Sequence, residues 1–230
     1  MKTPTINKEN NFILFGFPVI CTKIDKNSYD KKSIISTIEK NFKLNKKRNL
    51  WDQTSVLHHA YNDFSNPKYH KVNFTTLLPI YKEVLLTMFK KMDMVLKYEF
   101  NFEIVNYTCL SKSNFMTSHT HSNADFTAVH YIQFDNKHHT PTMFENTLPH
   151  VEYINNLRPK LIKILSNKHC LNSWAYKDWS LNTEEDDFCF SPAFLKHRID
   201  PQTSKNKNRI TIVLNITLKQ MDFNKKSRQQ

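Results

Sequence analysis

Residues 119–134 read HTHSNADFTAVHYIQF, and this stretch joins a polar turn to a β-strand. Phe126–Phe134 is rich in aromatic and β-branched residues, which favours a strand. If Ser122–Ala124 form a tight turn, His121 and Asp125 flank it and converge on one point from adjacent strands. Side chains alternate across a strand, so Tyr131 and its neighbour face opposite sides. The stretch therefore predicts antiparallel β-structure with polar groups gathered at one turn.

The same kind of pattern continues on both sides of this stretch. Further strands are expected at Tyr98–Leu110, Trp179–Leu181, Phe188–Phe190 and Arg209–Leu218, with a helical insertion at His150–Leu165. An extended segment or strand pair at Phe12–Ile24 and helices at Ser33–Leu44 and Thr76–Leu96 come before them. Asp30 or Ser28 is available to cap the first helix. Two helices leading into a run of strands predict a mainly β, α+β fold, a sandwich or barrel with the N-terminal helices packed on one face.

The length of 230 residues suits a single domain with a substantial core. Within it we expect an N-terminal strand with supporting helices at 11–97, a β-rich core at 98–218 and a flexible basic tail at 219–230.

Composition excludes several classes of protein. With one glycine, the chain contains neither a Walker A loop nor a dinucleotide-binding fingerprint. The four cysteines are far apart, and no signal peptide is recognisable, so we expect reduced thiols and a cytoplasmic location. No apolar stretch is long enough to span a membrane. The net charge of +12 allows an acidic partner such as nucleic acid, but a lysine-rich solvated surface is the commoner reason for such a charge.

Two imidazoles and a carboxylate lie within seven residues, and a third imidazole follows at His197. His121, Asp125 and His197 fit a 2-His-1-carboxylate site, which occupies one face of an Fe(II) ion and leaves positions open for other ligands. His119 lies two residues before His121, so in a strand both point to the same face. Two alternatives stay open: His119 is the first ligand with His121 in the second position, or it orients Asp125 or a bound water without binding metal.

Arg209 begins the last predicted strand, twelve residues after His197. A lone charged group entering an apolar strand is costly unless it meets an anion. A bidentate pair with an organic carboxylate would meet that need, and Thr211, on the same face, could add a hydrogen bond. The alternative is an arginine paired with Glu184, Glu185 or Asp186.

These motifs resemble those of 2-oxoglutarate/Fe(II) oxygenases of the type often encoded by phages and marine bacteria, which belong to the prolyl-hydroxylase-like superfamily. The resemblance lies in H-x-H-x-N-x-D-F, the strand TAVHYIQF, the run DDFCFSPAFLKH and the closing RITIVLN, over about residues 98–218. It implies a double-stranded β-helix, or jelly roll, with iron held near one mouth.

Carried over to this chain, the resemblance makes His121, Asp125 and His197 the iron ligands. It makes Arg209, with Thr211, the anchor for 2-oxoglutarate. Tyr131 matches a tyrosine that reaches the same cosubstrate in prolyl-hydroxylase-like relatives, and Tyr107 is a further candidate contact.

The activity implied is a dioxygenase, an oxidoreductase that uses Fe(II), 2-oxoglutarate and O₂ for hydroxylation or oxidative demethylation. The substrate could be a protein side chain, a small molecule or a nucleobase, and a phage origin would place the protein in a host cytoplasm. Two other functions remain open: a cupin-like metal protein that does not use 2-oxoglutarate, and a non-catalytic basic barrel that binds nucleic acid.

Overall fold

The computed structural model describes residues 11–14, 17–44, 59–60, 68–92, 98–148, 176–204 and 206–220. The predicted helix at His150–Leu165 and the predicted tail beyond Gln220 lie outside these residues. Within them, no helix is both long and apolar enough to cross a membrane.

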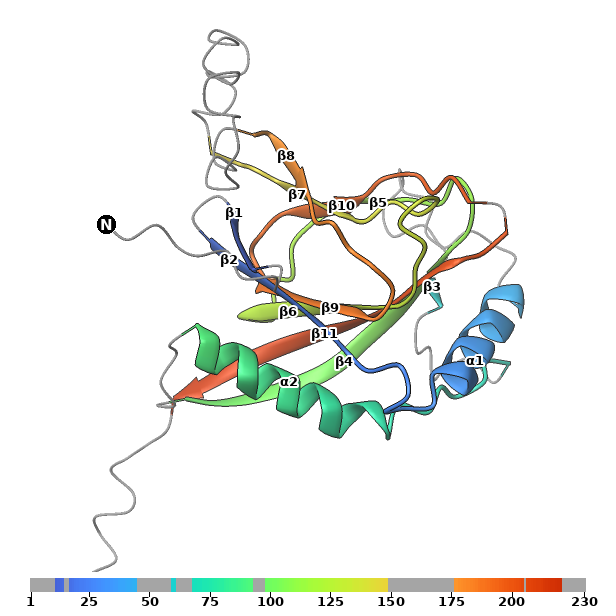
Figure 1. The fold of residues 1–230 in the computed structure, drawn as a ribbon, viewed down its shortest axis with the longest axis horizontal. Coiled ribbons are helices and arrows are strands. Elements are labelled where there is room, and N and C mark those ends of the chain that lie inside the picture. The colour runs from blue at the N-terminus through green and yellow to red at the C-terminus, as the bar shows by residue number, and fades with distance from the viewer. Residues whose placement is uncertain are drawn as a thin grey trace, which may run out of the picture.

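The described strands form two antiparallel sheets (Figure 1). The large sheet has the order β1-β2-β9-β6-β11-β4-β3, and the small sheet has the order β5-β10-β7-β8. The strands of the large sheet are β1 (Asn11–Leu14), β2 (Phe17–Lys23), β3 (His59–Ala60), β4 (Tyr98–Leu110), β6 (Phe126–Gln133), β9 (Asp187–Pro192) and β11 (Arg209–Gln220). Those of the small sheet are β5 (Met116–His119), β7 (Thr142–Glu145), β8 (Asp178–Ser180) and β10 (His197–Ile199).

Two helices cover one face of the large sheet. They are α1 (Lys31–Leu44) and α2 (Leu77–Lys91), and in Figure 1 α2 crosses β4 and β11. The backbone N–H of Ser33 donates to the Asp30 carboxylate at 3.2 Å, so Asp30 is the residue that caps α1. Buried apolar residues of both helices, such as Ile38 and Leu85, join the sheet residues in the main core. This packing confirms the predicted placement of the N-terminal helices.

The small sheet lies over the opposite face of the large sheet (Figure 1). A second apolar cluster between them includes Val19, Tyr131, Phe144 and Leu195. The described residues therefore form a mainly β, jelly-roll-like sandwich with two helices outside it, which confirms the fold class predicted from the sequence.

Strand β11 is central to the arrangement because it pairs with β6 on one side and β4 on the other. Its even-numbered residues Ile210 to Ile216 pack toward the helices. Its odd-numbered residues therefore face the small sheet. The pairing with β4 is irregular between Val213 and Leu214, where Val105 has no partner.

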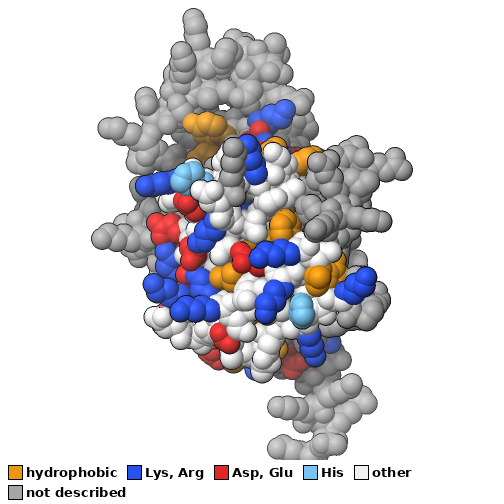
Figure 2. Space-filling view, turned by 90° about the vertical axis from the view of Figure 1, so that its right-hand side faces the viewer, with side chains coloured by type: hydrophobic (Ala, Val, Ile, Leu, Met, Phe, Trp, Pro, Cys, Tyr) orange, Lys and Arg blue, Asp and Glu red, His pale blue; other side chains and the backbone are white. Residues whose placement is uncertain are grey.

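On the face seen in Figure 2, Lys and Arg side chains are interspersed with Asp and Glu. The net charge of +12 therefore does not form a uniformly basic surface on this face.

Candidate functional site

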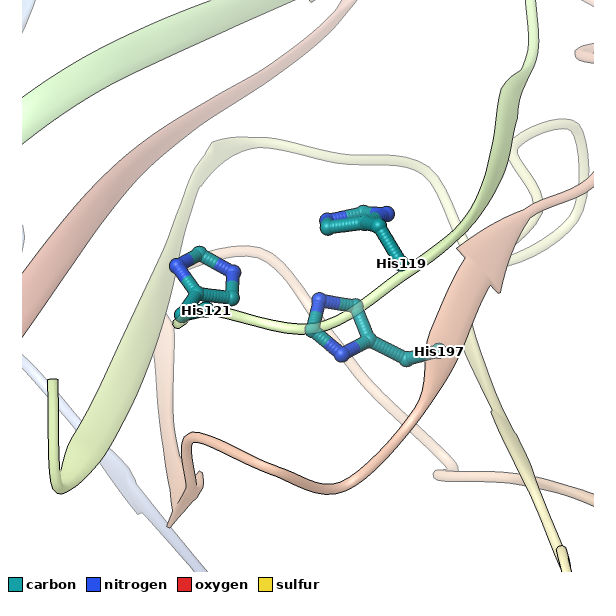
Figure 3. A group of neighbouring side chains, drawn as sticks. All are labelled: His119, His121 and His197. Atoms are coloured by element: carbon teal, nitrogen blue, oxygen red, sulfur yellow. The ribbon is translucent and has the colours of Figure 1, made fainter. Parts of the chain in front are cut away.

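Three histidines converge between the two sheets (Figure 3). His119 ends β5, His121 lies just beyond it, and His197 begins β10. Antiparallel pairing of β5 with β10 sets His119 opposite His197. One possible ligand nitrogen from each ring lies within 4.8 Å of the others, a spacing from which all three can reach one metal ion.

Each imidazole is held by a hydrogen bond at Nδ1. The ring of His119 lies 2.9 Å from the carbonyl oxygen of Thr117, and that of His197 lies 2.8 Å from the carbonyl oxygen of Leu195. Since a carbonyl only accepts, Nδ1 carries the proton and the ring lone pair is on Nε2. His121 has the same bond to a side chain, Oδ1 of Asn215, at 2.9 Å. Rings held in this way are typical of metal-binding histidines.

Burial keeps these imidazoles neutral at physiological pH. It lowers the pKa of His119 to about 4 and, together with the neighbouring His119, the pKa of His197 to about 3. The pKa of His121 is also lowered, chiefly by burial. Neutral imidazoles present lone pairs rather than protons, so all three are ready to bind a cation without first losing a proton.

The histidines border a pocket of about 310 Å³ between the sheets. Apart from the three imidazoles, the side chains around it are polar and uncharged or apolar. They are Val105, Asn106, Thr108, Met116, Thr120, Ser122, Asn123, Val129, Thr142, Ile199, Thr211, Val213 and Asn215.

A buried guanidinium adjoins this pocket. Arg209 is completely buried; its Nε donates to the carbonyl of Thr140 at 3.1 Å, and its Nη2 donates to the hydroxyl of Thr142 at 3.5 Å. Its carbon Cζ lies 5.1 Å from the centre of the Tyr131 ring. The remaining nitrogen, Nη1, has no hydrogen-bond partner. An unpaired buried cation of this kind needs an anion for full compensation.

The alternative pairing of Arg209 with the acidic run at Glu184–Asp186 is wrong. Glu184 pairs with Lys23, and Lys31 bonds both Glu185 (2.9 Å) and Asp186 (2.6 Å). Within the described part of the chain, no carboxylate forms an ion pair with Arg209. Burial accordingly lowers its pKa.

Asp125, predicted as the carboxylate ligand, lies outside the histidine group. Its side chain is exposed, and its Oδ2 accepts a hydrogen bond from the backbone N–H of Leu218 at 2.7 Å. Its own N–H donates to the carbonyl of Ile216, so the residue is tied to the end of β11. The side chains that the structure brings together are instead those of His119, His121 and His197, the set expected from the open alternative in which His119 is the first ligand and His121 the second.

The other three residues predicted to contact the cosubstrate lie at different distances from the pocket. Thr211 lines the pocket, and its hydroxyl lies 2.6 Å from that of Thr108. Tyr131 lies behind the lining, where its hydroxyl donates to Thr142 at 2.7 Å. Tyr107 faces the helices: it belongs to the main core, and its hydroxyl accepts a hydrogen bond from Nδ2 of Asn41 at 2.9 Å. The predicted contact of Tyr107 with the cosubstrate is therefore wrong, because strand alternation points this side chain away from the pocket.

The residues of the site that were not predicted include Asn215 and Thr142, which contact His121 and Arg209. Asn215 could have been found from its spacing, since it follows Arg209 and Thr211 on the same face of one strand. Thr142 carries no comparable sequence signal, because it reaches the site only through the pairing of β7 with β10.

No family model matches the chain, and no curated protein matches it. Among solved structures, a prolyl-4-hydroxylase of Pseudomonas putida aligns with 9% identity and a TM-score of 0.39, over 62% of this chain and 64% of that one. An oxidoreductase of the 2OG-Fe(II) oxygenase family from Burkholderia pseudomallei aligns with 7% identity and a TM-score of 0.35, over 59% and 57%. The chain thus spans less than two thirds of each. At these values the similarity does not assign an activity, and it gives no support to a phage or marine origin.

Proposed function

We propose that this chain is an Fe(II)- and 2-oxoglutarate-dependent dioxygenase whose metal is bound by three histidines. One observation carries the proposal: a single pocket is lined by three neutral imidazoles, and directly behind its lining residue Thr142 lies a buried guanidinium that lacks an anionic partner. A candidate cation site in the pocket and a buried guanidinium next to the pocket wall suit a cosubstrate that binds the metal at one end and an arginine at the other.

The metal would be held by Nε2 of His119, His121 and His197. Imidazole is a good ligand for iron as well as for zinc, copper and nickel, so the donor set fits Fe(II) without selecting it. Bound Fe(II) would supply, together with 2-oxoglutarate, the electrons for O₂ activation, and it would be a template for cosubstrate and substrate. The chain's own part is to keep the rings neutral and oriented and to enclose them between two sheets.

The carboxylate of 2-oxoglutarate that lies farther from the metal would pair with Arg209. Thr142, which already contacts the guanidinium, and Thr211, which lines the same pocket, would add hydroxyl hydrogen bonds. Tyr131 would act from behind by packing against the guanidinium and holding the Thr142 hydroxyl. Binding the anion would compensate a buried charge, so it should stabilise the fold as well as place the cosubstrate.

The proposed reaction couples oxidation of a substrate to conversion of 2-oxoglutarate and O₂ into succinate and CO₂. The substrate would enter beside the polar residues at the pocket's edge, Thr120, Ser122 and Asn123. Hydroxylation and oxidative demethylation both fit this arrangement, because they share the same first oxidation step.

A cupin-like metal protein that does not use 2-oxoglutarate is the second candidate. The observation that favours it is the position of Asp125, which leaves a donor set of three histidines in place of two histidines and a carboxylate. Such a set also serves metals that do no redox chemistry.

Anaerobic titration of the metal-free protein with Fe(II), and then with 2-oxoglutarate, separates the two candidates. The dioxygenase predicts a weak visible metal-to-ligand charge-transfer band when 2-oxoglutarate is added to the iron-loaded protein. Iron binding without the band would favour the second candidate. Failure to bind iron would contradict the dioxygenase, and failure to bind Zn(II) as well would contradict both candidates.

A further inference from the structure

The three imidazoles are not held in the same way. His119 and His197 lie in strands, and each is bonded at Nδ1 to the carbonyl two residues before it in its own chain segment. His121 lies beyond the end of β5 and has no such local acceptor. Its Nδ1 is bonded to Asn215, a residue 94 positions away on β11. The orientation of this one ring therefore depends on a distant side chain.

The backbone around His121 fixes its position but not its ring. Its N–H donates to the carbonyl of Ala193 at 2.9 Å, and the turn that follows is tied to β11 through Asp125. Neither bond restrains the side-chain torsions or determines which ring nitrogen carries the proton. In His119 and His197 the backbone carbonyl acceptor places the proton on Nδ1. In His121 the acceptor that does so is Oδ1 of Asn215.

We propose that Asn215 is a positioning residue that holds His121 in the Nδ1–H tautomer and aims its Nε2 at the centre of the histidine group. Asn215 is half-buried, lines the pocket and lies on the same face of β11 as Arg209. One strand thus orients a candidate metal ligand from its middle and carries the buried cation at its first residue. The tautomer assignment is independent of the proposed function, whereas its effect on metal affinity rests on that proposal.

The side chain at this position also sets how strongly the ring binds metal. A carboxylate acceptor would polarise the imidazole more than a neutral amide does and so raise the basicity of Nε2. The amide of Asn215 therefore gives a weaker ligand than an aspartate would. This difference allows a test in two directions, because one substitution removes the acceptor and another strengthens it.

The test uses the full chain with ¹⁵N-labelled histidine, in the wild type and in the variants Asn215→Leu and Asn215→Asp. Long-range ¹H–¹⁵N spectra of the metal-free protein report the tautomer of each ring. Zn(II) affinity is then measured by competition with a chromophoric chelator. Asn101→Leu, the same substitution at an exposed position of β4, is the matched control.

In Asn215→Leu we expect the His121 ring to lose its Nδ1–H tautomer while His119 and His197 keep theirs, and Zn(II) affinity to fall about 10- to 100-fold. Asn215→Asp should keep the tautomer and bind Zn(II) more tightly than the wild type. Asn101→Leu should change neither. If Asn215→Leu does not fold, Asn215→Asp still decides, since weaker Zn(II) binding by that variant overturns the proposal.

An unchanged His121 tautomer in folded Asn215→Leu overturns the proposal, whatever the metal affinity. If the wild type binds no Zn(II) or Fe(II), the proposed function fails, but the spectra of the metal-free protein still decide the role of Asn215. The two failures are therefore distinguishable.

Discussion

The two faces of the large sheet are formed by the same strands but carry different kinds of side chain. The face toward the helices is packed with apolar side chains, among them Ile212 and Leu214, both fully buried. The face toward the small sheet carries Thr108, Asn215 and a fully buried arginine with an unpartnered nitrogen. Alternation along β11 assigns successive residues to opposite roles, so one strand contributes to stability on one side and to binding on the other.

This contrast predicts two different effects of substitutions, one on stability and one on binding. A change on the helix face should unfold the protein and affect binding only through stability. A change on the pocket face should remove binding while the fold persists, because the polar residues there contribute less to the packed core.

The largest effect is expected on the pocket face, in His197→Ala. Loss of a ligand that is buried and central to the group should reduce metal affinity by more than the roughly 100-fold seen when only a supporting residue is lost. Equilibrium dialysis against Fe(II) or Zn(II), followed by metal analysis, measures it. Metal retained at wild-type affinity would mean that the histidine group is not the metal site.

On the helix face, Ile212→Ala should destabilise the fold by about 2–5 kcal/mol, because it leaves a cavity in a closely packed core. Denaturant unfolding measures this, with Val213→Ala as the matched change on the other face of the same strand. Val213 borders the pocket, so its truncation should cost less. Equal losses for the two variants would contradict the division of roles between the faces.

Arg209→Met tests the buried cation. Because the guanidinium has no anionic partner, its removal should leave the melting temperature in the absence of ligand unchanged or higher, while abolishing the rise produced by 2-oxoglutarate. Arg198→Met is the control: Arg198 bonds Glu145, Asp178 and Asp200, so its loss should lower the melting temperature. A similar fall for both variants would argue that Arg209 is structural.

A smaller effect concerns pH on the helix face. His130 is fully buried, its Nδ1 lies 2.8 Å from the Tyr81 hydroxyl, and burial lowers its pKa to about 3. Unfolding restores a pKa near 6.5, so the unfolded state binds the proton first and stability should fall as pH drops from about 6.5 toward 3.

Urea unfolding of the metal-free protein at pH 7 and pH 5 measures this dependence. His130→Gln should flatten the dependence, although part will remain from His119 and His197, whose pKa values are lowered in the same direction. An unchanged slope in that variant would mean that His130 does not contribute to it.

Much of the fold could be predicted from the sequence. The strand at Tyr98–Leu110 has the predicted bounds, and the strand predicted at Arg209–Leu218 extends two residues further, to Gln220. Long strands show their alternation clearly, whereas β5, β7 and β10 are three or four residues long and carry too little pattern to be predicted. The sequence predicts Phe126–Phe134 as one strand, and β6 ends one residue earlier.

The site was only partly predictable. The pairing of β5 with β10, which joins His119 to His197, is a long-range register that no local pattern reveals. The turn before β6 directs Asp125 to the backbone of Leu218, and spacing alone does not distinguish that orientation from one toward a metal. Binding to nucleic acid and a cytoplasmic location stay predictions from composition.

Metal affinity in His119→Ala and Asp125→Asn, measured side by side by chelator competition, tests the central claim most directly. Three-histidine binding predicts that His119→Ala loses metal while Asp125→Asn, which keeps a side-chain oxygen for the Leu218 N–H, binds as the wild type does. The reverse result, with metal lost in Asp125→Asn and retained in His119→Ala, would contradict the claim and restore a site of two histidines and a carboxylate.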